Sequence, residues 1–420
     1  MAKITVTDKE ALYYHQFPQA GKITVQSSKV VKTQKDLSLA YTPGVAVPCL
    51  EIEKNPEDAY KYTSKGNLVA VITNGTAVLG LGNIGALASK PVMEGKGVLF
   101  KNFSGLDCFD IELDTKSIDN FCSVVTAMAP TFGGINLEDI KAPECFEIER
   151  RLVEALDIPV MHDDQHGTAV ISAAAIINAV KVTNKKLEDL KIVVIGAGAA
   201  AISCARLYRY MGVKTIYMLD SKGLIHNGRS DLNEYKQEFS SKKYMSQTEV
   251  FEGADVAVGL SRPGSFSIED VKLMAENPIV FTLANPTPEI FPEDTQKARP
   301  DAIIATGRSD FDNQVNNVLG FPYIFRGAMD VRAKKINIEM KVAAAEALAD
   351  LATKEVPEYL NELYGKKIEF SKDYLIPKPF DKRLIVEISS AVAVAAIKSG
   401  SSTMTNFDLE EYKIELAKRI

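Results

Sequence analysis

A glycine-rich loop between a buried strand and a helix is the feature that most constrains the fold of this chain. The apolar run 191–195 has the length of a buried strand, and the GxGxxA pattern Gly196-Ala197-Gly198-Ala199-Ala200-Ala201 then opens a helix predicted over 199–211. Glycines at such a turn let the backbone approach a pyrophosphate, and the helix N-terminus offers N–H donors. Asp220 ends the next predicted strand, where a carboxylate can accept hydrogen bonds from ribose hydroxyls. The sequence therefore predicts a dinucleotide site here.

Short β-branched runs alternate with helical patterns throughout the second part of the chain. Strands are expected over 191–195, 214–219, 255–258, 278–283 and 302–305, and C-terminal helices over 333–352, 357–364 and 384–397. Such alternation is typical of βαβ units and a parallel sheet with helices on both faces. We therefore expect an α/β fold, with a Rossmann-type doubly wound domain over 166–420 and a separate N-terminal α/β catalytic domain over 1–165.

A second glycine loop, Gly80-Leu81-Gly82-Asn83-Ile84-Gly85, matches GxGxxG but has a poorer context. Pro91 is expected to end the following helix near Lys90, and no acid closes a second strand about 20 residues on. We expect these glycines to let a loop pack tightly near the functional site, and not to bind a dinucleotide.

Charge, cysteine content and hydropathy indicate which partners and which cellular compartment to expect. The 49 Lys and Arg against 55 Asp and Glu give a net charge of −6, so we expect no nucleic-acid partner. The five cysteines form no CxxC, which favours reduced thiols over a disulfide framework or a zinc ribbon. No apolar run approaches the roughly 20 residues of a bilayer span, and the N-terminus is too charged for a signal peptide. A cytoplasmic protein without a membrane partner is expected.

Paired acids follow two predicted strands in the first part of the chain. Glu138-Asp139 ends the strand 134–137, and Asp163-Asp164 ends the strand 158–162. Acids at neighbouring strand ends can face one cleft and supply the oxygen ligands that Mg²⁺ or Mn²⁺ prefers. Helix-capping and surface acids remain the alternative on spacing alone. His162 and His166 are four residues apart, but Asp163-Asp164 is predicted as a turn, which favours structural histidines over a zinc helix.

Several motifs, taken in order, resemble the malic enzyme family in its short bacterial and archaeal type. They run from about Tyr41 to Met329. They are Tyr41-Thr42-Pro43-Gly44-Val45-Ala46, Gly80 to Gly85, Pro91-Val92-Met93-Glu94-Gly95-Lys96, Glu138-Asp139, His162 to Thr168, Leu283-Ala284-Asn285-Pro286-Thr287, and Asn313 to Asn317. The resemblance implies oxidative decarboxylation of (S)-malate to pyruvate and CO₂ with reduction of NAD or NADP. It also implies dependence on Mg²⁺ or Mn²⁺ and a homodimer.

The resemblance also implies roles for individual residues. Tyr41 matches the general acid, Lys96 the general base, and Asp163 a proton-handling group beside the metal. The implied metal ligands are Glu138, Asp139 and Asp164. The expected cofactor-binding residues are Thr168, Gly196, Gly198, Ala199, Ala200, Asp220, Asn285 and Asn317. The expected substrate-binding residues are Asn74, Asn285, Asn316 and Asn317.

Two departures from the family pattern matter. Animal-type members carry an arginine for a malate carboxylate where this sequence has Ala77, so backbone N–H groups, Asn74 or another arginine must bind that carboxylate. The chain ends at residue 420, without the phosphotransacetylase-like extension of some bacterial members.

The chemistry sets further expectations. An ordinary lysine has a pKa near 10.4, so a basic Lys96 needs a pKa depressed by burial or by nearby positive charge. The charge of Asp220 repels a 2′-phosphate and favours NAD over NADP, although Lys222 and Arg229 can offset it. Whether Tyr41 serves its own or a partner's site stays open. The alternatives are an oxaloacetate decarboxylase, a malolactic-type enzyme and, remotely, a non-catalytic dinucleotide-sensing protein.

Overall fold

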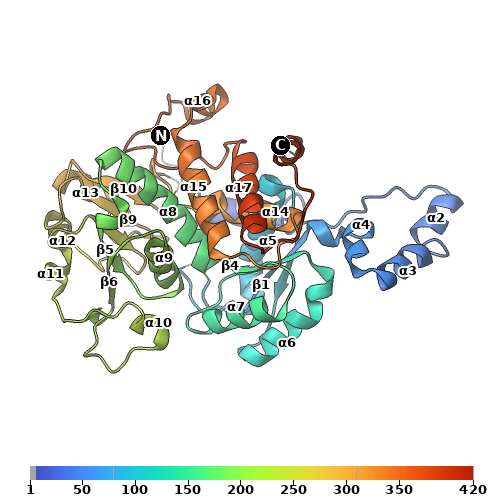
Figure 1. The fold of residues 1–420 in the computed structure, drawn as a ribbon, viewed down its shortest axis with the longest axis horizontal. Helices are drawn as coiled ribbons and strands as arrows, with labels where there is room; N and C mark the ends of the chain where they lie inside the picture. The colour runs from blue at the N-terminus through green and yellow to red at the C-terminus, as the bar shows by residue number, and fades with distance from the viewer. Residues whose placement is uncertain (1–5, 79, 309, 420) are drawn as a thin grey trace.

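Two β-sheets, one in each part of the chain, organise the protein (Figure 1). The computed structural model describes residues 6–78, 80–308 and 310–419. The first sheet has the strand order β2-β1-β3-β4 and the second the order β10-β9-β8-β5-β6-β7. All pairings are parallel except that of β7 with β6. The expected α/β class with a doubly wound sheet is confirmed.

The first sheet brings four strand ends to one edge. Its strands are β1 (Leu68–Thr73), β2 (Asp107–Glu112), β3 (Gly134–Leu137) and β4 (Val160–His162), and its helices are α5 (Ala86–Ser104), α6 (Ile118–Met128) and α7 (Glu144–Ala155). The β1 sequence is almost wholly apolar and every residue in it is buried, as expected for a central parallel strand. The residues that follow β1, β3 and β4 therefore share the carboxyl edge of this sheet.

Helix α5 continues straight through Pro91, so the expected end near Lys90 is wrong. Proline lacks the N–H that would bond to the Leu87 carbonyl, but the Leu87 side chain is 84% exposed, which leaves that carbonyl near water. Burial of Met93 and Phe100 on the inner face offsets the lost bond. The preceding loop packs tightly, as expected, because a Cβ at Gly80 would lie 2.8 Å from the Pro286 Cδ atom.

The second sheet agrees with the sequence to within one residue at each strand end. Its strands are β5 (Lys191–Ile195), β6 (Thr215–Asp220), β7 (Gly223–Leu224), β8 (Val256–Gly259), β9 (Ile279–Thr282) and β10 (Ile303–Thr306). Its connecting helices are α9 (Ala199–Tyr210), α10 (Glu234–Gln237), α11 (Gln247–Phe251), α12 (Ile268–Lys272) and α13 (Pro292–Ala298). Short β7, which the sequence did not indicate, turns the chain back after β6.

Helix α8 (Asp163–Thr183) joins the two sheets and lies against α9 and α15 (Ile338–Thr353). It begins directly at Asp163, so the predicted turn at 163–164 is wrong. Acids in the first helical turn are favoured by the positive end of the helix dipole, which explains the early start. By length and composition α8 could cross a membrane, but 61% of its apolar window is buried inside the protein. Most of its apolar surface is therefore covered by packing against neighbouring elements, chiefly α9 and α15.

C-terminal helices tie the second half of the chain back to the first. Besides α15 they are α14 (Phe321–Asp330), α16 (Glu358–Tyr364), α17 (Leu384–Lys398) and α18 (Leu409–Ala417). Helix α14 contacts both α17 and α5. Phe100 of α5 meets Phe321 and Phe325 edge to face, with ring centroids 4.8 and 5.4 Å apart. These contacts fix the position of α5 relative to the second half.

The N-terminal part carries four short helices: α1 (Asp8–Gln16), α2 (Gln34–Ala40), α3 (Ala46–Lys54) and α4 (Ala59–Tyr62). Figure 1 shows α2 and α3 projecting away from the body of the molecule. We call residues 33–62 the arm. No arm residue is buried. Its exposed large apolar side chains are Leu37, Leu39, Tyr41, Val45, Val47, Leu50 and Tyr62.

Candidate active site

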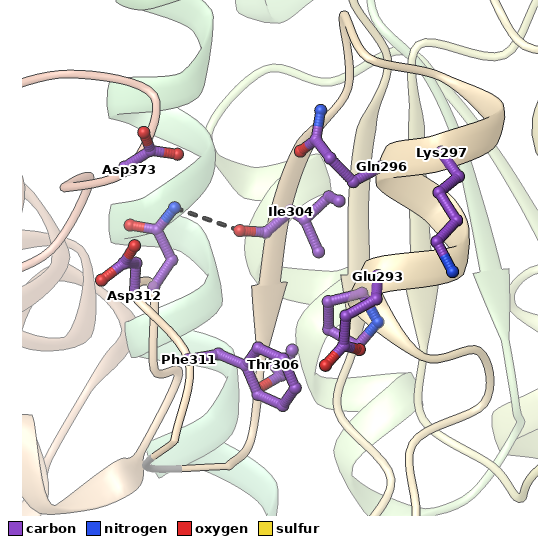
Figure 2. A pocket seen from close by; sticks show the side chains of 10 residues that line it. Glu293, Gln296, Lys297, Ile304, Thr306, Phe311, Asp312 and Asp373 are labelled. Atoms are coloured by element: carbon purple, nitrogen blue, oxygen red, sulfur yellow. Dashed lines mark hydrogen bonds between the residues drawn. The ribbon is translucent and has the colours of Figure 1, made fainter. Parts of the chain in front are cut away.

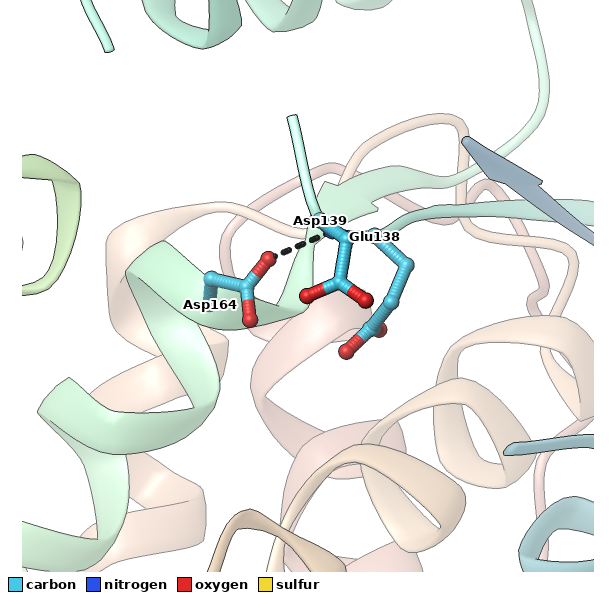
Figure 3. A group of neighbouring side chains, drawn as sticks. All are labelled: Glu138, Asp139 and Asp164. Carbon is cyan, nitrogen blue, oxygen red and sulfur yellow. Dashed lines mark hydrogen bonds between the residues drawn. The ribbon is translucent and has the colours of Figure 1, made fainter. Parts of the chain in front are cut away.

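Three carboxylates meet at the carboxyl edge of the first sheet. Glu138 and Asp139 follow β3, and Asp164 lies in the first turn of α8, just after β4. One oxygen from each lies within 4.8 Å of the others, and Figure 3 shows the three side chains converging. The Asp139 backbone N–H donates to Asp164 Oδ2 at 2.7 Å. We call these three residues the carboxylate cluster.

The donor chemistry of this cluster fits a hard divalent cation. It offers three anionic groups, and two further oxygens nearby, Asp163 Oδ1 and Asn136 Oδ1, are buried without a hydrogen-bond partner among the described residues. Mg²⁺ and Mn²⁺ take such oxygen ligands, whereas zinc sites favour nitrogen and sulfur. Within the part of the chain that the structure describes, the cluster is the sole group of this kind, and it contains neither His162 nor His166.

The two histidines belong to the support of the site. His162 is fully buried in β4. The His166 ring lies 2.9 Å from the Glu149 carboxylate of α7 through Nε2. Glu149 also accepts the His162 backbone N–H at 2.9 Å. These contacts agree with a structural role for His166, whereas both ring nitrogens of His162 are buried without a hydrogen-bond partner among the described residues.

Lys96 reaches the carboxylate cluster from the inner face of α5. Its Nζ atom lies 2.7 Å from Asp163 Oδ2 and 3.0 Å from Glu138 Oε1, and none of the three side chains is more than 7% exposed. The Phe321 ring centroid lies 4.3 Å from the same ammonium. The expected base Lys96, the proton-handling Asp163 and the three expected ligands are therefore brought together here from elements of the first half of the chain, with Phe321 of the second half beside the ammonium.

The protein groups around Lys96 do not by themselves lower its pKa, and the expected depression would need the positive charge of a bound cation. Burial lowers the pKa of Lys96, but the Asp163 and Glu138 carboxylates raise it by more, so the ammonium is held protonated. Burial in turn raises the pKa of Glu138 well above its ordinary value, against the effect of Lys96. Burial and nearby positive charge were expected to act on the Lys96 pKa, whereas the contact of two carboxylates with this lysine was not expected.

Small and amide side chains complete the surroundings of Asp163. Asn317, which begins the short 3₁₀ helix η5 (Asn317–Leu319), donates to Asp163 Oδ2. Asn136 of β3 donates to Glu138 Oε2 at 2.8 Å. A Cβ at Gly167 would lie 2.1 Å from Asp163 Oδ1, so only glycine fits there. Asn136 was missed by the sequence analysis, although a polar residue in an otherwise apolar strand is a usable signal.

The glycine loop after β5 has the geometry that a pyrophosphate requires. Gly196 has φ 125° and a Cβ there would lie 2.4 Å from the Leu260 carbonyl oxygen, so the turn needs glycine. At Gly198, which precedes α9, no atom lies within 4 Å of where a Cβ would stand. Ala199 and Ala200 form the first turn of α9. The helix N-terminus is thus open on the side of the second glycine.

Thr168, a further expected cofactor-binding residue, lies in the second turn of α8 and outside this loop.

Asp220 ends β6 as predicted, but its charge is already paired. Oδ1 accepts from the Lys222 backbone N–H at 2.9 Å and from Arg229 at 2.8 Å, and Oδ2 accepts from Arg229 and Lys236, each at 2.8 Å. Burial raises the pKa of Asp220, and these donors lower it by more. The Lys222 ammonium binds Asp231 instead, at 2.7 Å. Lys236 was missed, because it lies 16 residues from Asp220 in a segment without a motif.

The four expected asparagines differ in their surroundings. Only Asn317 contacts Asp163 directly. Asn285 follows β9, and its Nδ2 lies 3.6 Å from where a Cβ on Gly307 would stand. Asn316 caps η5, since its Oδ1 accepts the Val318 N–H at 3.0 Å. Asn74 accepts from Thr76 at 2.6 Å, beside a cavity of about 50 Å³ that Lys116 and Lys141 also line. These two lysines are cations near Ala77 that the sequence analysis overlooked.

Tyr41 stands apart from the other expected catalytic residues. It directly follows α2 on the projecting arm and is 70% exposed. Lys96 is a buried residue of α5. Figure 1 shows α5 within the body of the molecule, away from α2. One copy of the chain, in the arrangement described, does not bring Tyr41 to Lys96.

A larger pocket lies elsewhere. It has a volume of about 420 Å³ and runs along the edge strand β10 beside α13. Glu293 and Lys297 line one side and Asp312 and Asp373 the other (Figure 2). Asn313 closes one wall by donating to the Ile304 carbonyl at 3.1 Å. A pocket of about 670 Å³ is lined by residues between Thr353 and Phe370. None of the expected site residues lines either pocket, so size does not identify the functional site.

Known proteins match this chain along nearly its whole length. The family model "Malic enzyme, N-terminal domain" matches residues 20–117 and 115–153, and "Malic enzyme, NAD binding domain" matches residues 165–366. A probable NADP-dependent malic enzyme of Rickettsia prowazekii is 56% identical over 100% of this chain and 55% of its own length. An NADP-dependent malic enzyme of Halomonas elongata is 56% identical over 93% of both chains.

A solved structure agrees with these matches. The malic enzyme of Pyrococcus horikoshii superposes with a TM-score of 0.87 at 42% identity, covering 98% of this chain and 95% of that one. The chain spans about half the length of the Rickettsia relative and nearly all of the Halomonas relative. With both family domains matched in order and a relative of similar length more than half identical, the chain belongs to the malic enzyme family.

Proposed function

We propose that this chain oxidises (S)-malate with NAD(P)⁺ and decarboxylates the product to pyruvate and CO₂. The observation that carries the proposal is the contact of Lys96 with Asp163 and Glu138 beside the carboxylate cluster. Glu138, Asp139 and Asp164 would hold Mg²⁺ or Mn²⁺. When bound, that cation draws electron density from the malate C2 hydroxyl and C1 carboxylate.

The chain's own residues then handle two protons. Lys96 Nζ accepts the proton of the C2 hydroxyl, and Asp163, 2.7 Å away, takes it onward. Lys96 must first lose its own proton, and a cation that engages the Glu138 charge would remove one of the carboxylate charges that raise the Lys96 pKa. Hydride leaves C2 for the nicotinamide, which Asn285 and Asn317 help to position. After CO₂ departs, the Tyr41 hydroxyl protonates C3 of the enol.

Substrate carboxylate binding has four candidate contributors in place of the missing arginine. We propose that Asn317, which lies beside the carboxylate cluster, binds a substrate carboxylate. Asn316 caps η5 and so helps to hold the backbone at Asn317 in place. Asn74 and the neighbouring Lys141 supply polar and positive groups near Ala77. These assignments rest on proximity and charge.

Product analysis tests the proposed reaction. The full chain with malate, Mn²⁺ and NADP⁺ or NAD⁺ should give a steady rise of absorbance at 340 nm. The amount of pyruvate formed should equal the amount of coenzyme reduced. Lactate without net cofactor reduction would point to a malolactic enzyme. Pyruvate from oxaloacetate alone, with no activity on malate, would point to a decarboxylase. Coenzyme binding without turnover of either acid would point to a sensing protein.

We further propose a homodimer in which Tyr41 acts in the partner's active site. The arm exposes seven large apolar side chains and buries none of its residues. Exposed apolar surface of this extent marks an interaction site. The same arm carries Tyr41, which its own chain leaves 70% exposed. In a symmetric dimer each arm meets the other copy, so a single contact would cover the apolar surface and deliver the hydroxyl.

Mixing two inactive variants tests this exchange. Tyr41→Phe retains Lys96, and Lys96→Ala retains Tyr41. After subunit exchange half of the dimers are mixed, and each mixed dimer holds one complete site, so about a quarter of wild-type activity should return. The measurement is the malate-dependent rate after mixing, with each variant alone as the control. If Tyr41 acted within its own chain, no combination would be complete and activity would stay at the parental level.

For the coenzyme, we propose that NADP⁺ is accepted and that Asp220 restrains its use. All four lone-pair positions of the Asp220 carboxylate are taken, so a ribose hydroxyl finds little acceptor capacity there. Three cations and two acids surround the position, which leaves a net positive charge for a 2′-phosphate. This modifies the NAD preference expected from Asp220 alone.

Replacing Asp220 by alanine should shift the preference further toward NADP⁺. Arg229 stays fixed by Asp231, at 3.0 Å, while Lys236 loses its only carboxylate partner in the described structure. Charge-assisted hydrogen bonds to a phosphate would then form without competition, and the ratio of kcat/KM for NADP⁺ over NAD⁺ should rise about tenfold. Steady-state kinetics with both coenzymes measure this ratio. An unaltered ratio would show that other groups set the choice.

We also propose the division into a catalytic domain over 1–165 and a coenzyme domain over 166–420, with cytoplasmic location. The boundary falls at the start of α8, between the two sheets. The five cysteines are all free, which agrees with a reducing compartment.

A further inference from the structure

The segment that follows β7, residues 225–245, makes contacts on both halves of the chain. It leaves the second sheet, forms the short helix α10 and returns before α11. Towards its own half it carries Arg229 and Lys236, which bind Asp220 at the end of β6. Towards the other half it carries Tyr235. We call residues 225–245 the bridging segment.

Tyr235 forms an aromatic stack across the two halves. Its ring lies on that of Phe146 from α7, with centroids 4.2 Å apart and planes at 28°. Phe146 is 7% exposed and belongs to the main core, so it offers a fixed surface. Arg206 of α9 lies 5.7 Å from the same Tyr235 ring and is paired with Glu238 at 2.7 Å. The stack thus fastens α10 between α7 and α9.

Lys236 is the next residue along α10, so the stack controls where its ammonium can reach. Arg229 has a second anchor in Asp231, but Lys236 has Asp220 alone among the described residues. Lys236 is a long, rotatable side chain and 26% of it is exposed. Holding such a side chain in place before a ligand arrives saves the conformational entropy that binding would otherwise cost. Loss of the Tyr235 contact should therefore weaken the binding of a ligand that contacts Lys236.

We propose that Tyr235 is a positioning residue for the coenzyme: by stacking on Phe146 it holds Lys236 where the 2′-phosphate of NADP is received. The inference rests on the proposed function, since it takes the β5–α9 loop as the coenzyme site. The affinity for NADP therefore depends on Phe146, which lies in the same half of the chain as the carboxylate cluster. A coenzyme without the 2′-phosphate does not use Lys236 in this way and depends on the stack much less.

The test compares two coenzymes on the full chain, by fluorescence titration with NADPH and NADH. Tyr235→Ala should raise the Kd for NADPH about tenfold and the Kd for NADH less than about threefold. Tyr235→Phe keeps the ring and should stay within about twofold of wild type for both. The kcat at saturating NADP⁺ should be unchanged in Tyr235→Ala. Tyr244→Ala is the matched control, since Tyr244 lies in the same segment, is 69% exposed and contacts only the His226 ring among aromatic groups of the described chain.

A second pair of variants checks the route through Phe146. Phe146→Leu should weaken NADPH binding in the same direction, and adding it to Tyr235→Ala should cause no further loss, because both remove one contact. A wild-type Kd for NADPH in Tyr235→Ala overturns the inference and leaves the proposed function standing. Equal losses for NADPH and NADH, or additive losses in the double variant, also overturn it. A wild-type chain that binds neither coenzyme overturns the proposed function itself.

Discussion

Lys96→Ala should nearly abolish malate oxidation, with a loss of about 10²–10⁴-fold that is typical of a missing general base. The C2 hydroxyl then lacks a proton acceptor, so no hydride transfer should appear even in the first turnover. Rapid-mixing absorbance at 340 nm checks this directly. A small added amine should restore part of the rate by entering the vacated space beside Asp163 and Glu138.

The control for this variant must separate chemistry from folding. Removing Lys96 leaves two buried carboxylates without their partner, which also lowers the free energy of unfolding. Lys101→Ala is a matched variant on the same helix, where the lysine pairs with Asp107 at 2.7 Å and is 60% exposed. Circular dichroism should show both variants folded, and only Lys96→Ala should lose activity. A full-rate burst of NADPH in Lys96→Ala would contradict the role assigned to this residue.

Asp164→Asn and Glu138→Gln should each lower turnover about 10³-fold or more, because a bound cation stabilises the developing charge by several kcal/mol. Each change removes one negative charge from the carboxylate cluster and keeps the side-chain shape. Hard cations depend on anionic oxygen ligands, so Mn²⁺ affinity should fall together with turnover. Calorimetric titration with Mn²⁺ and steady-state rates at saturating metal measure the two effects.

An acid outside the cluster serves as the control for these two variants. Asp157 is 87% exposed and pairs with Lys334 at 3.2 Å, so Asp157→Asn should change neither Mn²⁺ affinity nor turnover. Asp164 is itself 36% exposed, and its substitution should perturb folding less than that of Glu138, which is 5% exposed. Unchanged Mn²⁺ affinity in both cluster variants would remove the basis for the metal site.

Local sequence was sufficient for the second sheet and for the two places where ligands are expected. Each strand from β5 to β10, apart from two-residue β7, contains a run of at least three apolar residues, so its position follows from hydrophobicity to within one residue at each end. Parallel strands also fix where their carboxyl ends lie, so acids after β3 and β4 can meet, but the choice of Glu138, Asp139 and Asp164 came from the resemblance to the family. The glycine at 196 was predictable because a positive φ at a tight turn excludes other residues.

Errors arose where a distant part of the chain, or a competing local preference, overrides a local rule. Pro91 would end an isolated helix, but the contacts of Phe100 with Phe321 and Phe325 stabilise α5 beyond it. Asp163-Asp164 resembles a turn in sequence, yet both acids favour the start of the long α8. Only the continuation of α5 past Pro91 depends on residues far along the chain, whereas the start of α8 follows from a local preference that competes with the turn.

The charges that decide reactivity were set by tertiary structure alone. The sequence identified Lys96 and Asp220 as functional residues, but an ionisable group takes its pKa and its electrostatic role from whatever lies within a few ångströms. Asp163 and Glu138 hold Lys96 protonated, and Arg229 and Lys236 neutralise Asp220, all through contacts between separate elements. The identity of these groups is a property of the sequence, whereas their proton affinity depends on distances that exist only after the separate helices, strands and loops of each half have packed together.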